Sequence, residues 1–535
     1  MKTQPKQEKS LISSEDFYLQ SWLWLCFGTL IFYLPFFFNF MWGNHDWGWI
    51  KEDTPLLSGL FEGRFSQFIL QNLLYNGKIL PILTLMTALS IFNFGLILLF
   101  KLWKLPHKNH LYILAGLNIV CAPYTLSWLY FAFITLSCLS WITVIIFAYT
   151  LLHIRPISQH PNLLLTAAVI LFTLALGGYP PIINLICLLF CSFALTDLCL
   201  KRLTVKSLIK KYIPYISAVT LSLICFGIIL YLLKKYHYQY DTYNTAEISL
   251  KDIFPKLLYT FKEGIKQFFI TTSFISYTYK YLNFCLFLLA LTLLCHKLPK
   301  TIPAILSFII LLSGLIFSSV ITTFISSNPL YVQNSPRIEF FGILYIYGFS
   351  SFILIKFAPQ LIKNISCLTL AFLLFYNLTT ISYAQKVWQL GFVSEMKLSE
   401  RILTRIEEYP EFNSRKKYTF IQSGTTDFRS RFYTSKLAST QDGYTLTAPY
   451  IPWHLPSKAY SFYYPTDFFG DDFDIFWQFV DKSKLNLSPD MIKYLANTSE
   501  VWPHPNSIYI DPNTIILTLS HDGQMRARNW LQYNL

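Results

Sequence analysis

The sequence predicts an all-α polytopic membrane protein with about eleven transmembrane helices, followed by a small α+β domain. Hydrophobic residues make up 53% of the 535 residues and charged residues only 13%, whereas a soluble domain has about 25% charged residues. Apolar stretches long enough to cross about 30 Å of hydrocarbon recur through residues 1–384. Residues 385–535 are polar and contain no such stretch.

Eleven apolar stretches account for the membrane part. They lie at about residues 20–42, 80–101, 111–122, 130–152, 163–178, 182–200, 212–233, 281–295, 302–324, 338–357 and 365–384. The third is short and ends at Pro123. The fifth and sixth meet at Gly177-Gly178-Tyr179-Pro180-Pro181, a turn that cannot continue a helix. The first is long enough to remain as a membrane helix, so no cleaved signal peptide is expected.

Basic residues occupy every second connection and predict the orientation. They are Lys2, Lys6, Lys9, Lys101, Lys104, Lys108, Arg155, Lys201, Arg202, Lys206, Lys210, Lys211, Lys297, Lys300, Lys356 and Lys363. The short connections near 123–128 and 177–181 contain no Lys or Arg. By the positive-inside rule the N-terminus is cytoplasmic, and an odd number of spans places residues 385–535 outside the cell inner (plasma) membrane. The net charge of +14 is thus explained by basic residues on the cytoplasmic side of a lipid bilayer, and no nucleic-acid partner is predicted.

The sequence predicts two domains, a transmembrane domain over residues 1–384 and an extracytoplasmic domain over residues 385–535. The transmembrane domain also contains two long connections. The connections span residues 43–79 and 234–280, both on the outer side. Apolar residues recur at helical spacing in Leu56–Leu74 and again between 254 and 268, which suits a helix lying in the membrane interface.

The tail carries equal numbers of acidic and basic residues, 16 of each, and enough chain for a small core. Its patterns predict a helix over Lys386–Glu408, a strand over Tyr418–Gln422 and a short helix over Asp490–Asn497. A hairpin is predicted around Asp511-Pro512-Asn513. Between 440 and 480 the sequence is rich in aromatic residues but has little periodicity.

Candidate catalytic acids follow from the orientation, because nine acids of the membrane part face outward and four of them lie in residues 43–79. Asp46 stands among His45, Trp47 and Trp49. Partial burial of a carboxylate among such residues raises its pKa towards that of a useful base, although a hydrated loop acid or a helix cap is the simpler alternative. Glu52 and Asp53 are weaker candidates, because Lys51 offers them an ordinary surface pair.

Two arginines are candidates for binding phosphate. Arg64, in Gly63-Arg64-Phe65, can bind phosphate with two parallel hydrogen bonds, or extend its charge to water from an interfacial helix. Arg337 opens the tenth stretch at the outer face, where helix-end anchoring is the alternative role.

Metal ligation is not predicted. The ten cysteines lie in or beside the apolar stretches without ligand spacing. Asp467, Asp471, Asp472 and Asp474 lack the glycine and terminal glutamate of a calcium-binding EF-hand loop.

The outer segment NHDWGW, holding Asp46, and the element EGRF before the second stretch resemble membrane glycosyltransferases of the GT-C type. More narrowly, the chain is similar to the O-antigen serotype-conversion glucosyltransferase family. The short third stretch, Tyr179-Pro180, Arg337 and the outer tail domain fit the same layout. One departure is that the family often has paired acids where this chain has His45-Asp46.

The resemblance implies an enzyme, an inverting glycosyltransferase that moves a hexose, expected to be glucose. The implied donor is a polyprenyl-phosphate-linked sugar, and the acceptor a lipid-linked or surface glycan such as the O-antigen of lipopolysaccharide. Asp46 would be the catalytic base, with His45, Glu52 or Asp53 as second acid or orienting residue. Arg64 or Arg337 would hold the lipid phosphate, so no cofactor is required and a divalent metal is optional.

A transporter or flippase of lipid-linked saccharides is the alternative from another functional class. Such a protein would place ionisable residues within the spans, and the apolar stretches of this chain contain almost none.

Overall fold

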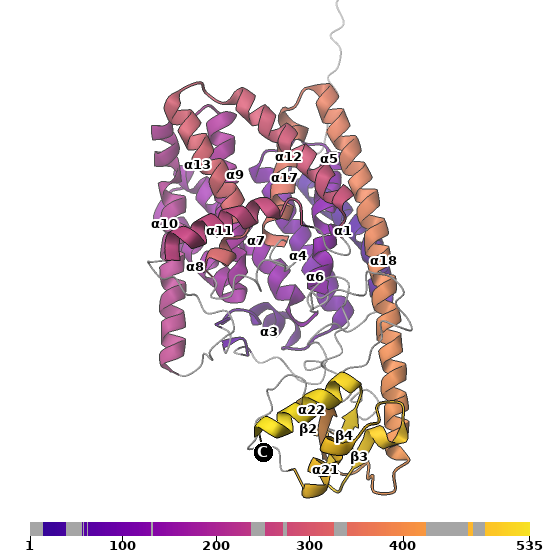
Figure 1. Cartoon of the computed structure of the whole chain (residues 1–535). Coiled ribbons are helices and arrows are strands. Elements are labelled where there is room, and N and C mark those ends of the chain that lie inside the picture. The colour runs from indigo at the N-terminus through magenta and orange to yellow at the C-terminus, as the bar shows by residue number, and fades with distance from the viewer. Residues whose placement is uncertain are drawn as a thin grey trace, which may run out of the picture. The chain divides into compact units, whose positions relative to one another are not determined.

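The computed structural model of the chain describes residues 14–38, 56, 58–60, 63–129, 132–236, 252–270, 275–325, 340–423, 469–474 and 487–534. These residues form two compact units, which comprise the described residues of 14–385 and of 386–534. The described part of the first unit contains helices and turns without strands, and the second contains a small sheet (Figure 1).

The long helices of the first unit coincide with the predicted apolar stretches. They are α1 (Ser14–Phe38), α4 (Pro81–Leu102), α5 (Asn109–Val120), α7 (Ala132–Ile154), α8 (Pro161–Gly178), α9 (Ile183–Cys199), α10 (Val205–Lys235), α12 (Tyr277–Lys297), α13 (Ile302–Ser318), α17 (Ile343–Phe357) and α18 (Gln360–Glu407). Among the described residues, eight helices are long and apolar enough to cross a membrane. A ninth crossing results if α5 and the following segment Pro123–Leu129, bent by 48°, form one span. Helices α13 and α17 are apolar but shorter, so this is a multi-pass architecture in which the count of eleven stays a prediction.

Local sequence explains where several of these helices begin. Pro81 and Pro161 lie in the first turns of α4 and α8, where a missing N–H removes no helical hydrogen bond. The side chains of Thr204 and Ser276 accept backbone N–H groups at the starts of α10 and α12, each at 3.3 Å. Such caps satisfy donors that the first helical turn leaves without partners.

Short connections gather at one end of the unit. This short-turn end contains residues 103–108, 155–160, 200–204, 298–301 and 358–359. The loop end, toward the opposite side, contains residues 63–80, 121–129, 179–182 and 252–270. Helix α4 packs on α7, α7 on α8, and α9 on α13. Helices α4 and α7 run in the same direction between the two ends, whereas α7 and α8, and α9 and α13, run in opposite directions (Figure 1).

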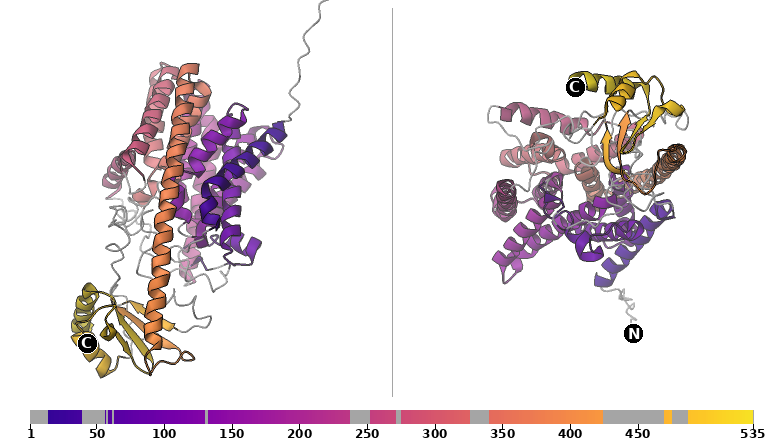
Figure 2. Two further views of the ribbon diagram at one scale, coloured as in Figure 1. Left: turned by 90° about the vertical axis from the view of Figure 1, so that its right-hand side faces the viewer. Right: turned by 90° about the horizontal axis from the view of Figure 1, so that it is seen from below.

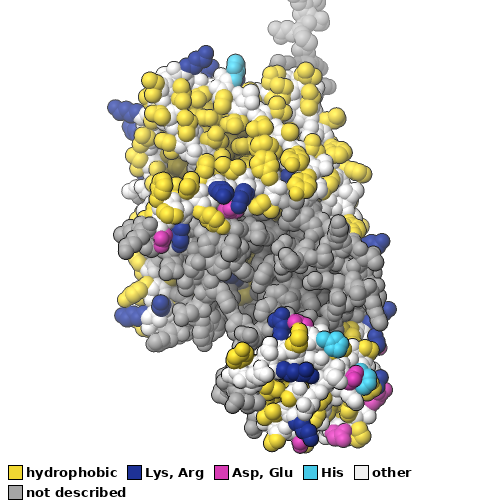
Figure 3. All heavy atoms as spheres, in the orientation of Figure 1, with side chains coloured by type: hydrophobic (Ala, Val, Ile, Leu, Met, Phe, Trp, Pro, Cys, Tyr) yellow, Lys and Arg dark blue, Asp and Glu magenta, His cyan; other side chains and the backbone are white. Residues whose placement is uncertain are grey.

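The outward surface of the first unit is strongly apolar. Ile310 on α13 is 69% exposed, and Leu368 on α18 is 75% exposed. Figure 3 shows a broad hydrophobic surface with basic side chains near its edges. A soluble protein rarely exposes so large an apolar area, so this surface indicates contact with lipid.

The second unit is built around a four-stranded mixed sheet of order β2-β1-β4-β3. Its strands are β1 (Tyr418–Ser423), β2 (Phe469–Asp474), β3 (Ile508–Ile510) and β4 (Thr514–Thr518). Strand β1 lies parallel to both β2 and β4, and β3 is antiparallel to β4. The predicted strand at 418–422 and the hairpin around 511–513 are therefore confirmed, whereas β2 was not predicted.

Both faces of this sheet are covered by helices (Figure 2). Alternate residues of a strand point to opposite faces, and Phe420 packs with Ile402 and Ile406 of α18. The next residue, Ile421, packs on the other face with α21 (Pro489–Asn497) and α22 (His521–Asn534). The predicted helix at 490–497 is confirmed, with Ser488 accepting a hydrogen bond from Met491 N at 3.2 Å, and α22 is an additional helix.

Candidate functional site

Most of the predicted site residues lie outside the described part of the chain. His45, Asp46, Glu52, Asp53 and Arg337 all fall there. Their proposed roles therefore remain predictions. Arg64 lies within the described part, at the loop end of the first unit.

Arg64 lies in a tight turn and not in the interfacial helix predicted over Leu56–Leu74. Gly63 has a φ of 69°, a left-handed conformation that glycine adopts without steric cost. Gly63 N donates to Leu60 O and Arg64 N donates to Gly59 O, both at 2.9 Å. The prediction of a helix over Leu56–Leu74 is therefore wrong in its first part, because these turns interrupt it, and helix α3 covers only Ile69–Tyr75.

The segment after Arg64 is fixed to the end of α8. Ser66 N donates to Gly177 O at 3.1 Å, and the Ser66 hydroxyl donates to Leu174 O. The Phe65 ring lies so close to Gly177 that a Cβ at that position would overlap it. Phe65 also lies near Phe226, with ring centroids 6.1 Å apart. The Gly63-Arg64-Phe65 element and the Gly177-Gly178 turn, far apart in sequence, thus form one structural unit.

This attachment places the Arg64 guanidinium over an aromatic residue. Its Cζ lies 5.3 Å from the centre of the Tyr179 ring, a distance typical of a cation–π contact. Tyr179 is 5% exposed. Its ring contacts Trp128 edge-on at 5.1 Å and Phe341 at 5.7 Å. Arg64 therefore borders a cluster of large aromatic rings.

A second cation contacts the same bent segment, which consists of η2 (Pro123–Thr125) and α6 (Leu126–Leu129). Lys280 Nζ lies 5.2 Å from the centre of the Tyr124 ring and donates a hydrogen bond to Gln267 O at 2.7 Å. Lys280 is 0% exposed. Tyr124 and Trp128 are one helical turn apart, so this segment links the surroundings of Lys280 to those of Arg64.

Helix α11 (Ile253–Lys266) turns a polar stripe towards the protein. Thr260, Glu263 and Gln267 are buried, while Phe254 is 75% and Leu258 61% exposed. The predicted helical periodicity between 254 and 268 is confirmed. This arrangement is typical of a helix whose apolar side faces lipid.

The carboxylate of Glu263 has a cationic partner in this stripe. It accepts a hydrogen bond from Lys266 Nζ at 2.6 Å. The hydrogen bond to the Glu263 carboxylate raises the pKa of Lys266 above its ordinary value.

Together these residues make a loop-end site whose accessible cation, Arg64, is suited to an anionic ligand. Arg64 is partly exposed and can meet a ligand directly, whereas Lys280, Tyr179, Trp128 and Tyr124 are buried and act as its support and as nearby charge. Within the described residues, no group of three or more His, Cys, Asp or Glu side chains is placed to hold a metal.

The sequence reasoning missed Lys280 and Glu263 as members of this site. One signal was present for each. Polar residues recur at helical spacing through Thr260, Glu263 and Gln267, opposite the apolar stripe. Lys280 is a lone cation that directly precedes an apolar stretch.

The chain matches no protein family model, no curated protein and no solved structure. The resemblance to O-antigen glucosyltransferases therefore remains a prediction from short motifs. Two of them, Gly63-Arg64-Phe65 and Tyr179-Pro180, lie side by side at the loop end through the contact of Arg64 with Tyr179.

Proposed function

We propose that the chain is an inverting membrane glycosyltransferase that moves a hexose, expected to be glucose, from a polyprenyl-phosphate-linked donor to a lipid-linked or surface glycan such as O-antigen. The observation that carries this proposal is the position of Arg64 over Tyr179, beside Trp128. The phosphate of a sugar–lipid donor is an anion, and the partly exposed guanidinium of Arg64, held against the buried aromatic cluster, is suited to bind it with paired hydrogen bonds.

The proposal places the loop end outside the cell inner membrane and the short-turn end in the cytoplasm. It counts eleven spans, a cytoplasmic N-terminus and a periplasmic second unit. The distribution of basic residues among the short connections supports this orientation. The donor phosphate would then reach Arg64 from the outer leaflet.

In the proposed reaction, the Asp46 carboxylate accepts the proton of the acceptor hydroxyl as its oxygen attacks the anomeric carbon. The new glycosidic bond forms while the bond from that carbon to the donor phosphate oxygen breaks, and the polyprenyl phosphate leaves. Attack from the face opposite the leaving group inverts the anomeric configuration. General-base assistance of this kind contributes about 10²–10⁴ in rate.

Cations near the leaving group stabilise its developing negative charge. We assign this role to Arg64, with Lys280 as a second cation at the same end and Arg337 as a further candidate. His45, Glu52 and Asp53 remain candidates for the residue that orients or assists Asp46. No step requires a metal ion.

Replacement of Arg64 tests the proposal. Arg64→Gln should lower sugar transfer to the surface glycan about 10²–10³-fold, the effect of removing one preorganised donor to a developing charge. Arg64→Lys should retain part of the activity, because it keeps the charge but loses the paired hydrogen bonds. The measurement is the glycan composition of cells that express each variant at equal membrane levels.

The exposed Lys78 provides the matched control, and Lys78→Gln should transfer sugar normally. Unchanged glycan in Arg64→Gln cells would contradict the proposal. A transporter or flippase of lipid-linked saccharides would be indicated if purified protein moved labelled sugar-lipid across vesicle membranes and never transferred the label to glycan.

A further inference from the structure

A cavity of about 180 Å³ lies at the short-turn end of the first unit, between α4, α7, α9, α10 and α17. Its lining includes four lysines, Lys104, Lys201, Lys211 and Lys356, and a single acid, Asp197. We call it the lysine cavity. These four lysines line one partly open cavity: Lys104 and Lys201 are exposed, and Lys211 and Lys356 are partly buried.

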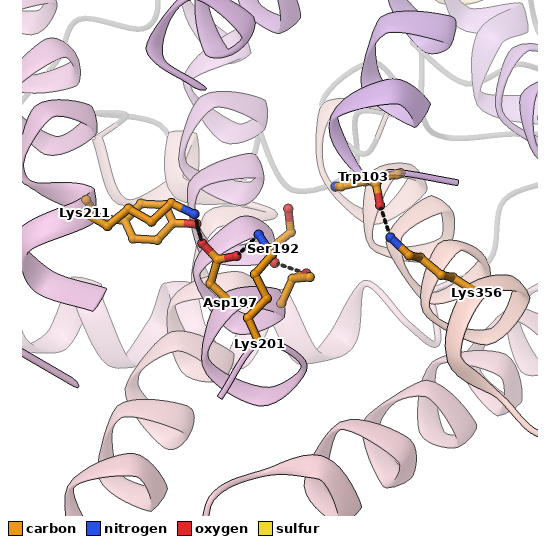
Figure 4. A network of polar contacts seen from close by, with 8 residues as sticks. Trp103, Ser192, Asp197, Lys201, Lys211 and Lys356 are labelled. Carbon is orange, nitrogen blue, oxygen red and sulfur yellow. Dashed lines mark hydrogen bonds and ion pairs between the residues drawn. The ribbon is translucent and has the colours of Figure 1, made fainter. Parts of the chain in front are cut away.

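Asp197 holds two of the four lysines in place. Its side chain is 3% exposed, and its two carboxylate oxygens accept hydrogen bonds from Lys201 and Lys211. The hydroxyl of Tyr212 donates a third hydrogen bond at 2.8 Å. Figure 4 shows the two lysines reaching Asp197 from different directions. A buried carboxylate with this many partners stays ionised, so it can neutralise only one of the two charges it fixes.

The other two lysines add charge that Asp197 does not neutralise. Lys356 Nζ donates to Trp103 O at 3.0 Å, a carbonyl at the end of α4 (Figure 4). Lys104 follows Trp103 and has a φ of 57°, a backbone conformation that favours glycine over lysine. None of the ion pairs among the described residues involves Lys104 or Lys356. The lysine cavity therefore carries a clear excess of positive charge.

We propose that the lysine cavity binds one phosphate group, supplied by the headgroup of an anionic phospholipid or by free phosphate. Basic pockets between membrane helices on the cytoplasmic side are suited to anionic headgroups. Ammonium groups bind phosphate as point charges, and the cavity provides several of them around one space. Phe193 and Phe357 in the lining offer apolar walls for the glycerol part of a lipid.

The volume limits the size of the ligand. At about 30 Å³ for each water in the liquid, 180 Å³ holds about six waters. Pockets for drug-sized ligands such as nucleotides occupy about 300–1,000 Å³. A phosphate headgroup therefore fits inside the cavity, whereas a nucleotide sugar would extend beyond it.

This site is separate from the proposed glycosyltransferase site. Helix α9 begins at Ile183, next to the loop end, and Asp197 lies fourteen residues further along it. At about 1.5 Å per residue the two levels are about 21 Å apart. One phosphate cannot occupy both sites, and the lysine cavity requires no particular chemistry at Arg64.

The test is ligand binding to the purified full-length chain in detergent. Native mass spectrometry would count bound phosphatidylglycerol, with phosphatidylcholine as the headgroup of no net charge, and calorimetry would measure inorganic phosphate. In Lys104→Gln/Lys356→Gln the dissociation constant for phosphatidylglycerol should rise about 30-fold, since each lysine contributes about fivefold at such a surface. The pair Lys297 and Lys300, exposed on another turn of the same end, provides the charge-matched control.

The control Lys297→Gln/Lys300→Gln should bind within twofold of the natural protein. Phosphatidylcholine should bind at least tenfold more weakly than phosphatidylglycerol. Inorganic phosphate that binds as tightly as phosphatidylglycerol identifies a free anion as the ligand, and much weaker binding identifies the lipid. Equal effects of the two double variants, or equal binding of the two lipids, would overturn the proposal.

A further variant separates ligand binding from folding. Lys104→Gly removes one charge and relieves the left-handed backbone of Lys104. We expect a thermal midpoint at or above that of the natural protein and about fivefold weaker phosphatidylglycerol binding. Undiminished binding in this variant would also overturn the proposal.

Discussion

Two cations at the loop end are held against aromatic rings and not in open water. Desolvation of an ammonium costs several kcal/mol even after relaxation, and Lys280 is fully buried. The carbonyl of Gln267 and the ring of Tyr124 offset part of that cost, the ring by up to about 2 kcal/mol. If the side chain at this position served apolar packing alone, leucine or methionine would fill the space without the desolvation cost of an ammonium group. A cation kept at this position therefore points to use of its charge.

Asp46 is the residue on which the proposed chemistry depends most. Asp46→Asn keeps the size of the side chain but cannot accept a proton as a carboxylate does. We expect sugar transfer to fall by about 10²–10⁴, while the protein still inserts in the membrane at normal levels. The measurement is transfer of labelled sugar in membrane fractions.

Asp252, exposed beside α11, serves as the matched control for Asp46. Asp252→Asn should transfer sugar within twofold of the natural protein. Normal transfer by Asp46→Asn would exclude Asp46 as the base and leave Glu52, Asp53 and the buried Glu263 as the acids to examine.

At the scale of elements, the attachment of residues 63–68 to the end of α8 positions Arg64. It depends on the absence of a side chain at Gly177, against which the Phe65 ring lies. Backbone and side-chain hydrogen bonds of Ser66 hold the same two segments together. A change far from Arg64 in sequence should therefore disturb its position.

Gly177→Ala tests this dependence. The added methyl group would meet the Phe65 ring, and overpacking of this kind costs about 1–3 kcal/mol. We expect a lower thermal midpoint and reduced sugar transfer. Gly227→Ala on α10 is the control, because a Cβ there has nothing within 4 Å.

A second change should reverse the defect. Phe65→Leu combined with Gly177→Ala makes room for the methyl group, and the thermal midpoint should recover towards the natural value. A Gly177→Ala protein as stable and active as the Gly227→Ala control would show that this attachment does not position Arg64.

Elements were predictable where local pattern determines them. Continuous apolar stretches marked the long helices, and Gly177-Gly178-Tyr179-Pro180-Pro181 marked the turn between α8 and α9. Strand β2 was not predicted, because FGDDFD lacks apolar alternation and pairing with β1 decides its conformation. Helix α22 could have been predicted from the helical spacing of the apolar residues Ala527, Trp530 and Leu531, which are buried in the structure.

The candidate site was less predictable than the fold. Gly63-Arg64-Phe65 was predicted as a motif from the sequence. Its contact with Tyr179 was not predictable, because that contact joins segments distant in sequence. Burial of Lys280 depends on Tyr124 and Gln267 together. The lysine cavity has the same origin, because its charges come from four separate helix ends that only the fold brings together.

At the scale of the whole molecule, the number of spans decides which connections face the cytoplasm. Within the part of the chain that the structure describes, eight helices meet the length and composition requirements for a membrane span, and the bent pair of α5 and Pro123–Leu129 makes nine. Eleven requires that α13 and α17 also cross. Nine and eleven are both odd, so a reporter fused to the C-terminus cannot distinguish the two totals. A C-terminal reporter that is active only in the cytoplasm would, however, overturn the proposed orientation.

Reporters on either side of α13 can distinguish nine spans from eleven. Its 17 residues extend about 26 Å at 1.5 Å per residue, slightly less than the hydrocarbon thickness of about 30 Å. The following α14 (Ile321–Ile325) adds length. We expect fusions truncated after Lys300 to be active with a cytoplasmic reporter, and fusions truncated after Ile325 or carrying the whole chain to be active with a periplasmic one. Cytoplasmic activity after both Lys300 and Ile325, with a periplasmic C-terminus, would mean that α13 and α17 enter the membrane without crossing it. The apolar surface of α13, including Ile310 at 69% exposure, favours a crossing, since such a surface needs lipid along its length.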